Sequence, residues 1–273
     1  MNLVNKKLRV YSKEHLEYLK NRKVKLFKIK FFQMLILFLF LLCWEIFAYL
    51  KWIDVFIVSC PSRIIKTLIN LNASGQLWIN VYYTVAETVV GFVLGTILGL
   101  LFAILIWYSD LIYEISEPYL VVLNALPKVA LGPIIIVWLG AGMTSIILMA
   151  LLVSVVVSTI NILSGFRSIG KDSLILMKSF GANKFQILSK LVIPANITTI
   201  ISTLKINVGM SLIGVITGEF LVSSKGVGYL IVYGGQVFKL DLVMAGIFIL
   251  LVIASMMYMT VAKMENIYLK NKK

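Results

Sequence analysis

Acidic residues, histidine and cysteine are all scarce in this chain of 273 residues, which holds 12 Asp and Glu, one His and two Cys. One histidine cannot supply a metal cluster, and the hydrolase and metalloprotease patterns G-x-S-x-G and H-E-x-x-H are missing. Cys43 lies in an apolar run and Cys60 stands beside Pro61, so the pair indicates neither a disulfide framework nor a metal site. The sequence predicts no catalytic residues and no metal.

Charged residues of either sign are also few, at 14% of the chain, whereas 60% of the residues are hydrophobic and the mean hydropathy is +0.97. Soluble domains usually have about 25% charged and about 45 to 50% apolar residues. On a soluble protein this apolar content would form large exposed patches, which argues against a water-soluble enzyme and against a disordered chain. We expect an integral membrane protein.

Six apolar runs are long enough to cross a bilayer. About 20 mostly apolar residues span the roughly 30 Å of hydrocarbon as a helix, and a helix satisfies its backbone polar groups internally. The uncharged stretch 129–166 is too long for one crossing, so we divide it at Gly140-Ala141-Gly142. The expected spans are 31–50, 81–107, 118–139, 144–163, 198–221 and 242–262. The predicted fold class is all-α, with six transmembrane helices.

Basic residues are unevenly placed along the chain, which holds 26 Lys and Arg and has a net charge of +14. If the six spans alternate from a cytoplasmic N-terminus, nineteen bases fall on the cytoplasmic side and five on the other. Positively charged short loops are retained in the cytoplasm, so we expect both termini there. We attribute this charge to topology and to contact with anionic lipid rather than to nucleic-acid binding.

The connection between the fourth and fifth spans, 164–197, is the longest cytoplasmic loop expected. Leu174, Met177 and Lys178 fall at helical spacing, and Gly181 is suited to end that helix. Phe185 and the leucines after it resume the helical period before Pro194. The pattern predicts a helix, a glycine turn and a second helix, which would either lie in the membrane interface or present an apolar face to a soluble partner.

A nucleotide-binding motif is nearly matched at the start of this loop, where Gly165 to Asp172 read G-x-x-x-x-G-K-D. A P-loop needs Ser or Thr after the Lys to hold Mg²⁺, and it needs a preceding strand. Here Asp172 takes that place and a membrane span precedes the motif. We therefore expect no nucleotide on this chain.

The loop resembles that of the permease subunits of bacterial ATP-binding-cassette importers, which work with a substrate-binding protein. Their signature is E-A-A, three residues, Gly, nine residues and then I-x-L-P. In this sequence Gly181 is followed by nine residues and by Leu191-Val192-Ile193-Pro194, while Ile175, Leu176 and Met177 replace E-A-A. Further stretches are similar to the subgroup for nitrate, taurine and aliphatic sulfonates, among them Leu123-Asn124-Ala125-Leu126-Pro127, Leu131-Gly132-Pro133 and Gly226-Val227-Gly228-Tyr229-Leu230-Ile231.

The resemblance implies a permease fold and a division of the chain into a basic N-terminal segment 1–30, a first helix with an external loop 31–80, a permease core 81–262 and a basic tail 263–273. It also implies that the loop's first helix is a coupling helix that docks on an ATPase. The implied coupling residues are Leu174, Ile175, Leu176, Met177, Lys178, Phe180, Gly181, Ala182, Phe185 and Pro194.

The implied function is import of a small solute, anionic or zwitterionic, such as a sulfonate, taurine, nitrate or a vitamin precursor, across the bacterial plasma membrane. The implied partners are two ATPase subunits, which would bind the ATP and Mg²⁺, a second permease copy and an extracytoplasmic binding protein. This chain itself would bind no cofactor and would not be an enzyme. The alternative is a secondary transporter or channel that is not coupled to ATP, for which we find no proton or ion relay.

Several polar or helix-breaking positions in the spans are candidates for the translocation path. Gly132-Pro133 would kink or interrupt the third span, and acids such as Glu219 are costly in a membrane unless they face a partner or a cavity. Helix packing is the competing explanation for each of them. The candidate path residues are Asn124, Gly132, Pro133, Asn161, Asn207 and Glu219.

Overall fold

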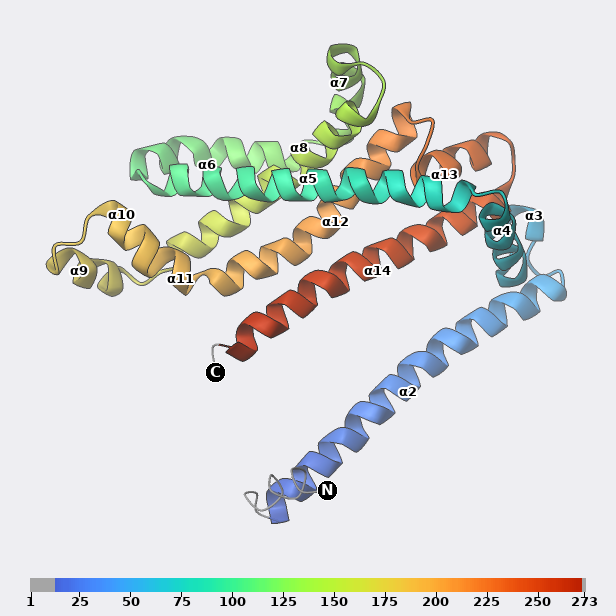
Figure 1. The fold of residues 1–273 in the computed structure, drawn as a ribbon, viewed down its shortest axis with the longest axis horizontal. Coiled ribbons are helices and arrows are strands. Elements are labelled where there is room, and N and C mark those ends of the chain that lie inside the picture. The colour runs from blue at the N-terminus through green and yellow to red at the C-terminus, as the bar shows by residue number, and fades with distance from the viewer. Residues whose placement is uncertain (1–12, 272–273) are drawn as a thin grey trace. The chain divides into compact units, whose positions relative to one another are not determined.

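The computed structural model describes residues 13–271, with side chains described for residues 17–267. Every regular element in that range is a helix (Figure 1), which confirms the all-α fold class. The start of the predicted basic N-terminal segment, residues 1–12, and the last two residues of the basic tail lie outside the described residues. The chain divides into two compact units, Met1–Ile64 and Ile65–Lys273, which are described separately.

The first unit consists of one long helix and a short return. It contains α2 (Lys13–Tyr49), α3 (Val55–Val58) and the first turn of α4 (Pro61–Ala73). The first predicted span, 31–50, falls in α2 apart from its last residue. The backbone N–H of Ser62 donates to Oε2 of Glu45 over 3.0 Å. Glu45, an acid inside the predicted span, thus stabilises the positive N-terminal end of α4.

The second unit is built on four long helices, α5, α8, α12 and α14. Its elements after α4 are α5 (Gln76–Trp107), α6 (Asp110–Ala125), the 3-10 helix η2 (Lys128–Leu131), α7 (Gly132–Leu139), α8 (Met143–Arg167), α9 (Lys171–Ser179), α10 (Lys184–Ile187), the π-helix η3 (Leu188–Val192), α11 (Ile193–Ala195), α12 (Ile197–Val222), α13 (Val227–Gln236) and α14 (Leu240–Asn271). With α2, five described helices are long and apolar enough to cross a membrane. A bent pair of helices brings the number to six if it forms one span.

The bent pair, Asp110–Ala125 with Lys128–Leu139, contains the third predicted span, 118–139. The expected interruption of this span is present, but its predicted place is wrong. The chain instead forms α6, a break at Leu126-Pro127 and then η2 with α7, and the two arms meet at 87°. Leu126 has an extended backbone, with φ −61° and ψ 128°. A residue that precedes proline is driven from the helical to the extended region, so Pro127 accounts for the break. Gly132 and Pro133, where we expected the interruption, begin α7 instead.

Small residues bring α5 and α8 into close contact. Gly91, Gly95 and Gly99 recur every four residues on α5, and all three are buried. A Cβ atom added to Gly91 would lie 2.5 Å from Cβ of Ala150, and one added to Gly99 would collide with Ser158. The stripe of small residues therefore serves helix packing.

The loop elements gather at the two ends of the bundle (Figure 1). At the Trp107 end of α5, Ala103 and Ile106 pack with Phe166 of α8 and with buried residues of α10 and η3. At the other end of α5, Asn80 contacts the first residues of α13. The hairpin of α9 and α10 and the helix α13 therefore lie at opposite ends of α5.

Candidate functional site

The loop 164–197 folds as a helical hairpin. α9 ends at Ser179, and Gly181 turns the chain with φ +76°, in the left-handed region that favours glycine. Asn183 caps the start of α10: its side chain accepts from the backbone N–H of Gln186, while the Gln186 side chain accepts from the backbone N–H of Asn183. This capping box fixes the second helix. The predicted order of helix, glycine turn and helix is confirmed.

Pro194 lies inside the second arm rather than after it. The arm runs from α10 through the π-helix η3 into α11, where Pro194 is in the first turn. Proline has no backbone N–H to donate in a hydrogen bond. In a regular α-helix its ring also collides with the carbonyl group four residues earlier. The wider π turn just before Pro194 relieves that collision, because its hydrogen bonds reach five residues back.

The ten predicted coupling residues lie on two different faces of the hairpin. Leu174, Met177 and Ala182 are half-buried and pack against the core cluster of α5, α8 and η3. Four large apolar side chains point the other way, with exposed fractions of 60% for Ile175, 56% for Leu176, 78% for Phe180 and 66% for Phe185. We call these four residues the exposed apolar face. Lys178, Gly181 and Pro194 are also exposed.

Basic side chains tie the hairpin to neighbouring helices. Lys184 Nζ donates to the backbone oxygen of Tyr108 over 3.1 Å, just past the C-terminal end of α5, where a positive charge is stabilised. Arg167, at the end of α8, pairs with Asp110 over 3.2 Å and lies over the ring of Tyr113. The loop is thus anchored to the C-terminal end of α5 and to the start of α6.

The six predicted path residues do not meet at one place. Asn124 and Pro133 are exposed, Asn161 is half-buried in α8, and Gly132 is buried where an added Cβ would collide with Leu221 and Met149. Asn207 is buried and donates from Nδ2 to Thr96 Oγ1 over 2.8 Å. The contacts of Gly132 and Asn207 therefore support helix packing, the alternative explanation for these two residues, rather than a role in the translocation path.

Glu219 is the centre of a buried polar network that sequence reasoning missed. Its Oε1 accepts from the hydroxyl of Thr84 over 2.6 Å, and its Oε2 accepts from the backbone N–H of Gly228 over 2.5 Å. Thr84 in turn accepts from the N–H of Val227, and Asn80 accepts from the N–H of Gly226. Three successive backbone N–H groups at the start of α13 are thus satisfied by α5 and α12.

The glycines around α13 follow from this network. A Cβ on Gly228 would lie 2.7 Å from Oε2 of Glu219, and one on Gly226 would collide with the same carboxyl group. Gly226 also has φ +110°. Glu87 is buried beside Glu219, and its Oε2 has no hydrogen-bond partner among the described residues. The pattern Gly226-Val227-Gly228 is the sequence signal of a backbone that approaches a buried carboxyl group.

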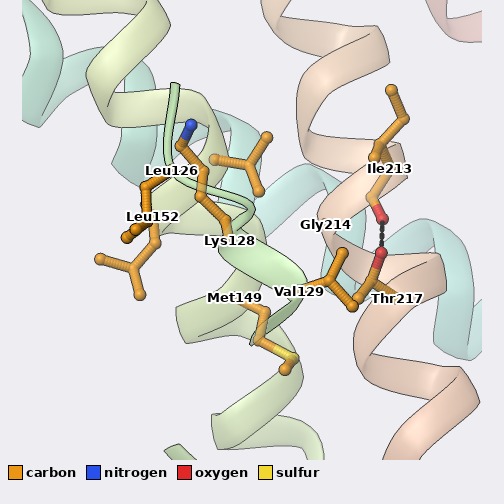
Figure 2. A pocket seen from close by; sticks show the side chains of 9 residues that line it. Leu126, Lys128, Val129, Met149, Leu152, Ile213, Gly214 and Thr217 are labelled. Carbon is orange, nitrogen blue, oxygen red and sulfur yellow. Dashed lines mark hydrogen bonds between the residues drawn. The ribbon is translucent and has the colours of Figure 1, made fainter. Parts of the chain in front are cut away.

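A cavity of about 160 Å³ lies at the break in the third span. Figure 2 shows Lys128 and Val129 between side chains of α8, such as Met149, and residues of α12, such as Thr217. The lining is apolar except for Lys128 and Thr217, and the Thr217 hydroxyl donates to the Ile213 carbonyl. Neither Lys128 nor Thr217 is among the predicted path residues. A lone charge beside the break was the signal that could have pointed to this cavity.

Comparison with known proteins identifies this arrangement. Residues 95–264 match the family of the binding-protein-dependent transport system inner membrane component. The chain belongs to this family. It is 30% identical to a probable ABC transporter permease of Haemophilus influenzae, over 84% of this chain and 92% of that protein. The chain is therefore a transmembrane permease subunit of an ATP-binding-cassette importer.

Two other relatives of this permease have names that include a solute. It is 27% identical to the formylaminopyrimidine transport permease of Halalkalibacterium halodurans, over 84% of this chain and 91% of that protein. It is also 27% identical to a putative aliphatic sulfonates transport permease of Bacillus subtilis, over 83% of this chain and 82% of that protein.

The fold of the permease is that of solved importers. The inward-facing MetNI methionine ABC transporter superposes with a TM-score of 0.62 at 14% identity, over 69% of this chain and 95% of that chain. The expected permease fold is confirmed.

Proposed function

We propose that this permease carries a small anionic or zwitterionic solute, such as a sulfonate, taurine or nitrate, or a vitamin precursor, across the bacterial plasma membrane. Two ATPase subunits bind ATP and Mg²⁺ and drive the cycle, a second copy of this chain completes the path, and an extracytoplasmic binding protein delivers the solute. The cytoplasm holds both termini and the α9–α10 hairpin. This chain itself binds no cofactor.

The observation that carries the proposal is the exposed apolar face of the hairpin. Four large apolar side chains of the hairpin have exposed fractions of 56% to 78%, and the base Lys178 of the same hairpin is exposed as well. Apolar groups gathered in this way on a polar, basic loop are the mark of an interaction surface. A groove on a soluble subunit that receives one helix would cover them.

The internal face of the hairpin supports transmission of force. Leu174, Met177 and Ala182 pack on the same cluster as Phe166 of α8 and Ile106 of α5. Because packed interiors shift as units rather than deform continuously, a displacement of the hairpin would be passed to both spans. The ATPase would therefore move α5 and α8 through this cluster.

The solute class is supported by the names of the relatives, which include permeases for aliphatic sulfonates and for formylaminopyrimidine. These solutes are small and polar. Thermal-shift measurements on the cognate binding protein with nitrate, sulfonates, taurine and vitamin precursors would identify the ligand. A binding protein stabilised by none of them would contradict the solute class.

A matched pair of substitutions tests the docking role. Phe180→Ala removes an exposed ring, so we expect the affinity for the ATPase to fall about tenfold or more, as at a binding hot spot, with little change in the stability of the permease. Met177→Ala lies three residues earlier and removes a packed side chain, so we expect lower thermal stability instead. Microscale thermophoresis would measure the affinity for the ATPase, and thermal unfolding in detergent would measure the stability of the permease. Undiminished ATPase binding by Phe180→Ala would contradict the docking site.

Energy coupling is tested separately in proteoliposomes that hold the complete transporter. We expect uptake of the solute identified above to require ATP and to stop when the ATPase is inactivated. Uptake that persists with an inactive ATPase would contradict the proposal and favour a transporter that is not coupled to ATP.

A further inference from the structure

Lys128 is an isolated charge within the third predicted span, 118–139. It is the only charged residue between Glu117 and Arg167 in the sequence, and it begins η2 at the break in the third span. Across the cavity lie Met149, in the N-terminal half of α8, and Thr217, near the C-terminal end of α12. Ionisable residues inside a membrane are costly and are usually retained at pathways for ions or solutes. The position of Lys128 therefore calls for a partner.

Contacts within the described chain satisfy Lys128 only in part. Its Nζ donates to the backbone oxygen of Asn124 over 3.1 Å, at the last turn of α6. The salt bridges formed between described residues do not include Lys128. A lysine ammonium has three donors, so this contact leaves two donors and a full positive charge for another acceptor.

The cavity beside Lys128 has the size and character of a small-solute site. Its volume of about 160 Å³ corresponds to roughly five water molecules at about 30 Å³ each. Small-molecule sites are mostly apolar and carry a few polar groups that fix the ligand. Here the free donors are those of Lys128, because the Thr217 hydroxyl donates to the Ile213 carbonyl. Discontinuous membrane helices are common at such sites, because the break opens space and polar groups inside the membrane.

We propose that Lys128 is the residue of the translocation path that contacts the solute's negative group, so that the path selects solutes with a compact anionic group such as a sulfonate, carboxylate or nitrate. This inference rests on the proposed function and deepens it. The ammonium replaces part of the hydration that the anion loses on entering the apolar cavity. We assign the bound anion to a water-soluble solute. The phosphate of a lipid headgroup is the alternative source of a negative group at Lys128.

Cysteine labelling of the complete permease–ATPase complex tests the proposal without knowledge of the solute. Cys43 and Cys60 are first replaced by alanine, and Thr217→Cys places a thiol in the cavity. The probes are the anionic reagent sulfonatoethyl methanethiosulfonate and the cationic reagent trimethylammonioethyl methanethiosulfonate. We measure the ratio of their labelling rates in the nucleotide-free and the ATP-bound complex. Ala73→Cys, at the exposed C-terminal end of α4, is the control thiol far along the sequence from Lys128.

In at least one state we expect the anionic reagent to be favoured at position 217, and Lys128→Gln to lower the ratio several-fold, because Lys128 and Thr217 line the same cavity and a charge acts more strongly in a medium of reduced dielectric constant than in water. Lys128→Arg keeps the charge and should preserve the ratio, which also separates loss of charge from misfolding. The ratio at position 73 should not change with either substitution.

Two outcomes would overturn the proposal. An unchanged ratio in Lys128→Gln would mean that Lys128 does not act on anions in the cavity. A thiol at position 217 that neither water-soluble reagent labels in any state would mean that the cavity faces lipid. The labelling needs neither the solute nor ATP-driven uptake, so its failure is distinct from failure of the proposed function.

Discussion

The bundle of α5, α8 and α12 and the broken third span are both mostly apolar in sequence, yet they differ in packing. In the bundle, Ala150 and Val215 are fully buried, and Gly214 lies against the backbone of α8. α6 has no buried residue, and Tyr119, for example, is 68% exposed. Residue size, rather than hydrophobicity, separates the two regions.

The physical reason is that lipid is as apolar as the helices themselves. Helices in a bilayer associate where small residues allow close approach and where polar groups can pair, not where large apolar side chains are most abundant. Gly, Ser and Thr therefore mark the interior of the bundle, and the large side chains of α6 and α7 mark surfaces left for lipid or for another subunit.

The largest effect is expected where the backbones are closest. A Cβ on Gly214 would lie 2.5 Å from Cα of Ala150, so Gly214→Leu must push α12 and α8 apart. We expect a loss of more than about 3 kcal/mol of stability and little folded protein, because overpacking against a backbone cannot be relieved by a rotamer change. Size-exclusion chromatography of the purified permease in detergent measures the folded yield.

Gly209→Leu is the matched control for that experiment. Gly209 lies on the same helix, is exposed, and has nothing within 4 Å of an added Cβ. We expect its folded yield to equal that of the unmodified protein. Equal yields for the two variants would show that close approach of α12 to α8 is not required for the fold.

A smaller effect is expected at Glu219, which joins α13 to the bundle. Glu219→Ala leaves the Thr84 hydroxyl and the Gly228 N–H buried without their acceptor, which costs about 3 kcal/mol in total. We expect faster amide hydrogen exchange in α13 and a lower unfolding temperature. Glu219→Gln keeps one side-chain acceptor and should lose less.

The exposed acid Glu114 on α6 provides the comparison for Glu219. Glu114→Ala removes the same kind of side chain from an exposed position and should leave hydrogen exchange in α13 unchanged. If both alanine variants exchanged alike, the network around Glu219 would not be what holds α13 in place.

Local patterns were enough to predict most of the helices. The predicted spans 144–163 and 198–221 correspond to α8 and α12 within a few residues at each end, because a long and mostly apolar run has few alternatives to a helix. The glycine turn at Gly181 was also legible, since a helical period stops there and resumes after it.

Contacts between distant segments were not predictable in this way. Thr84 and Glu219 are 135 residues apart, and nothing in the period of either helix relates them. The break at Pro127 was missed because the apolar composition continues through it, although a proline restrains the residue before it. Lys128 was treated as the boundary of an apolar run, whereas the break places it on a cavity.

The smallest effect is expected at Gly181, at the turn of the hairpin. Its φ of +76° is unfavourable for any residue with a Cβ, although nothing lies within 4 Å of the added atom. Gly181→Ala should therefore cost about 1 kcal/mol through backbone strain alone. The strain is local, so we expect faster hydrogen exchange in α9 and α10 but unchanged global unfolding. We expect ATPase binding to weaken several-fold, because the exposed apolar face spans both helices.

Gly170→Ala is the matched control, in the same loop at φ −57° with equally open space, and should change neither the hydrogen exchange nor the ATPase binding. If the two variants bound the ATPase equally well, the geometry of the turn would not matter to docking, and the exposed face of α9 alone would have to account for it.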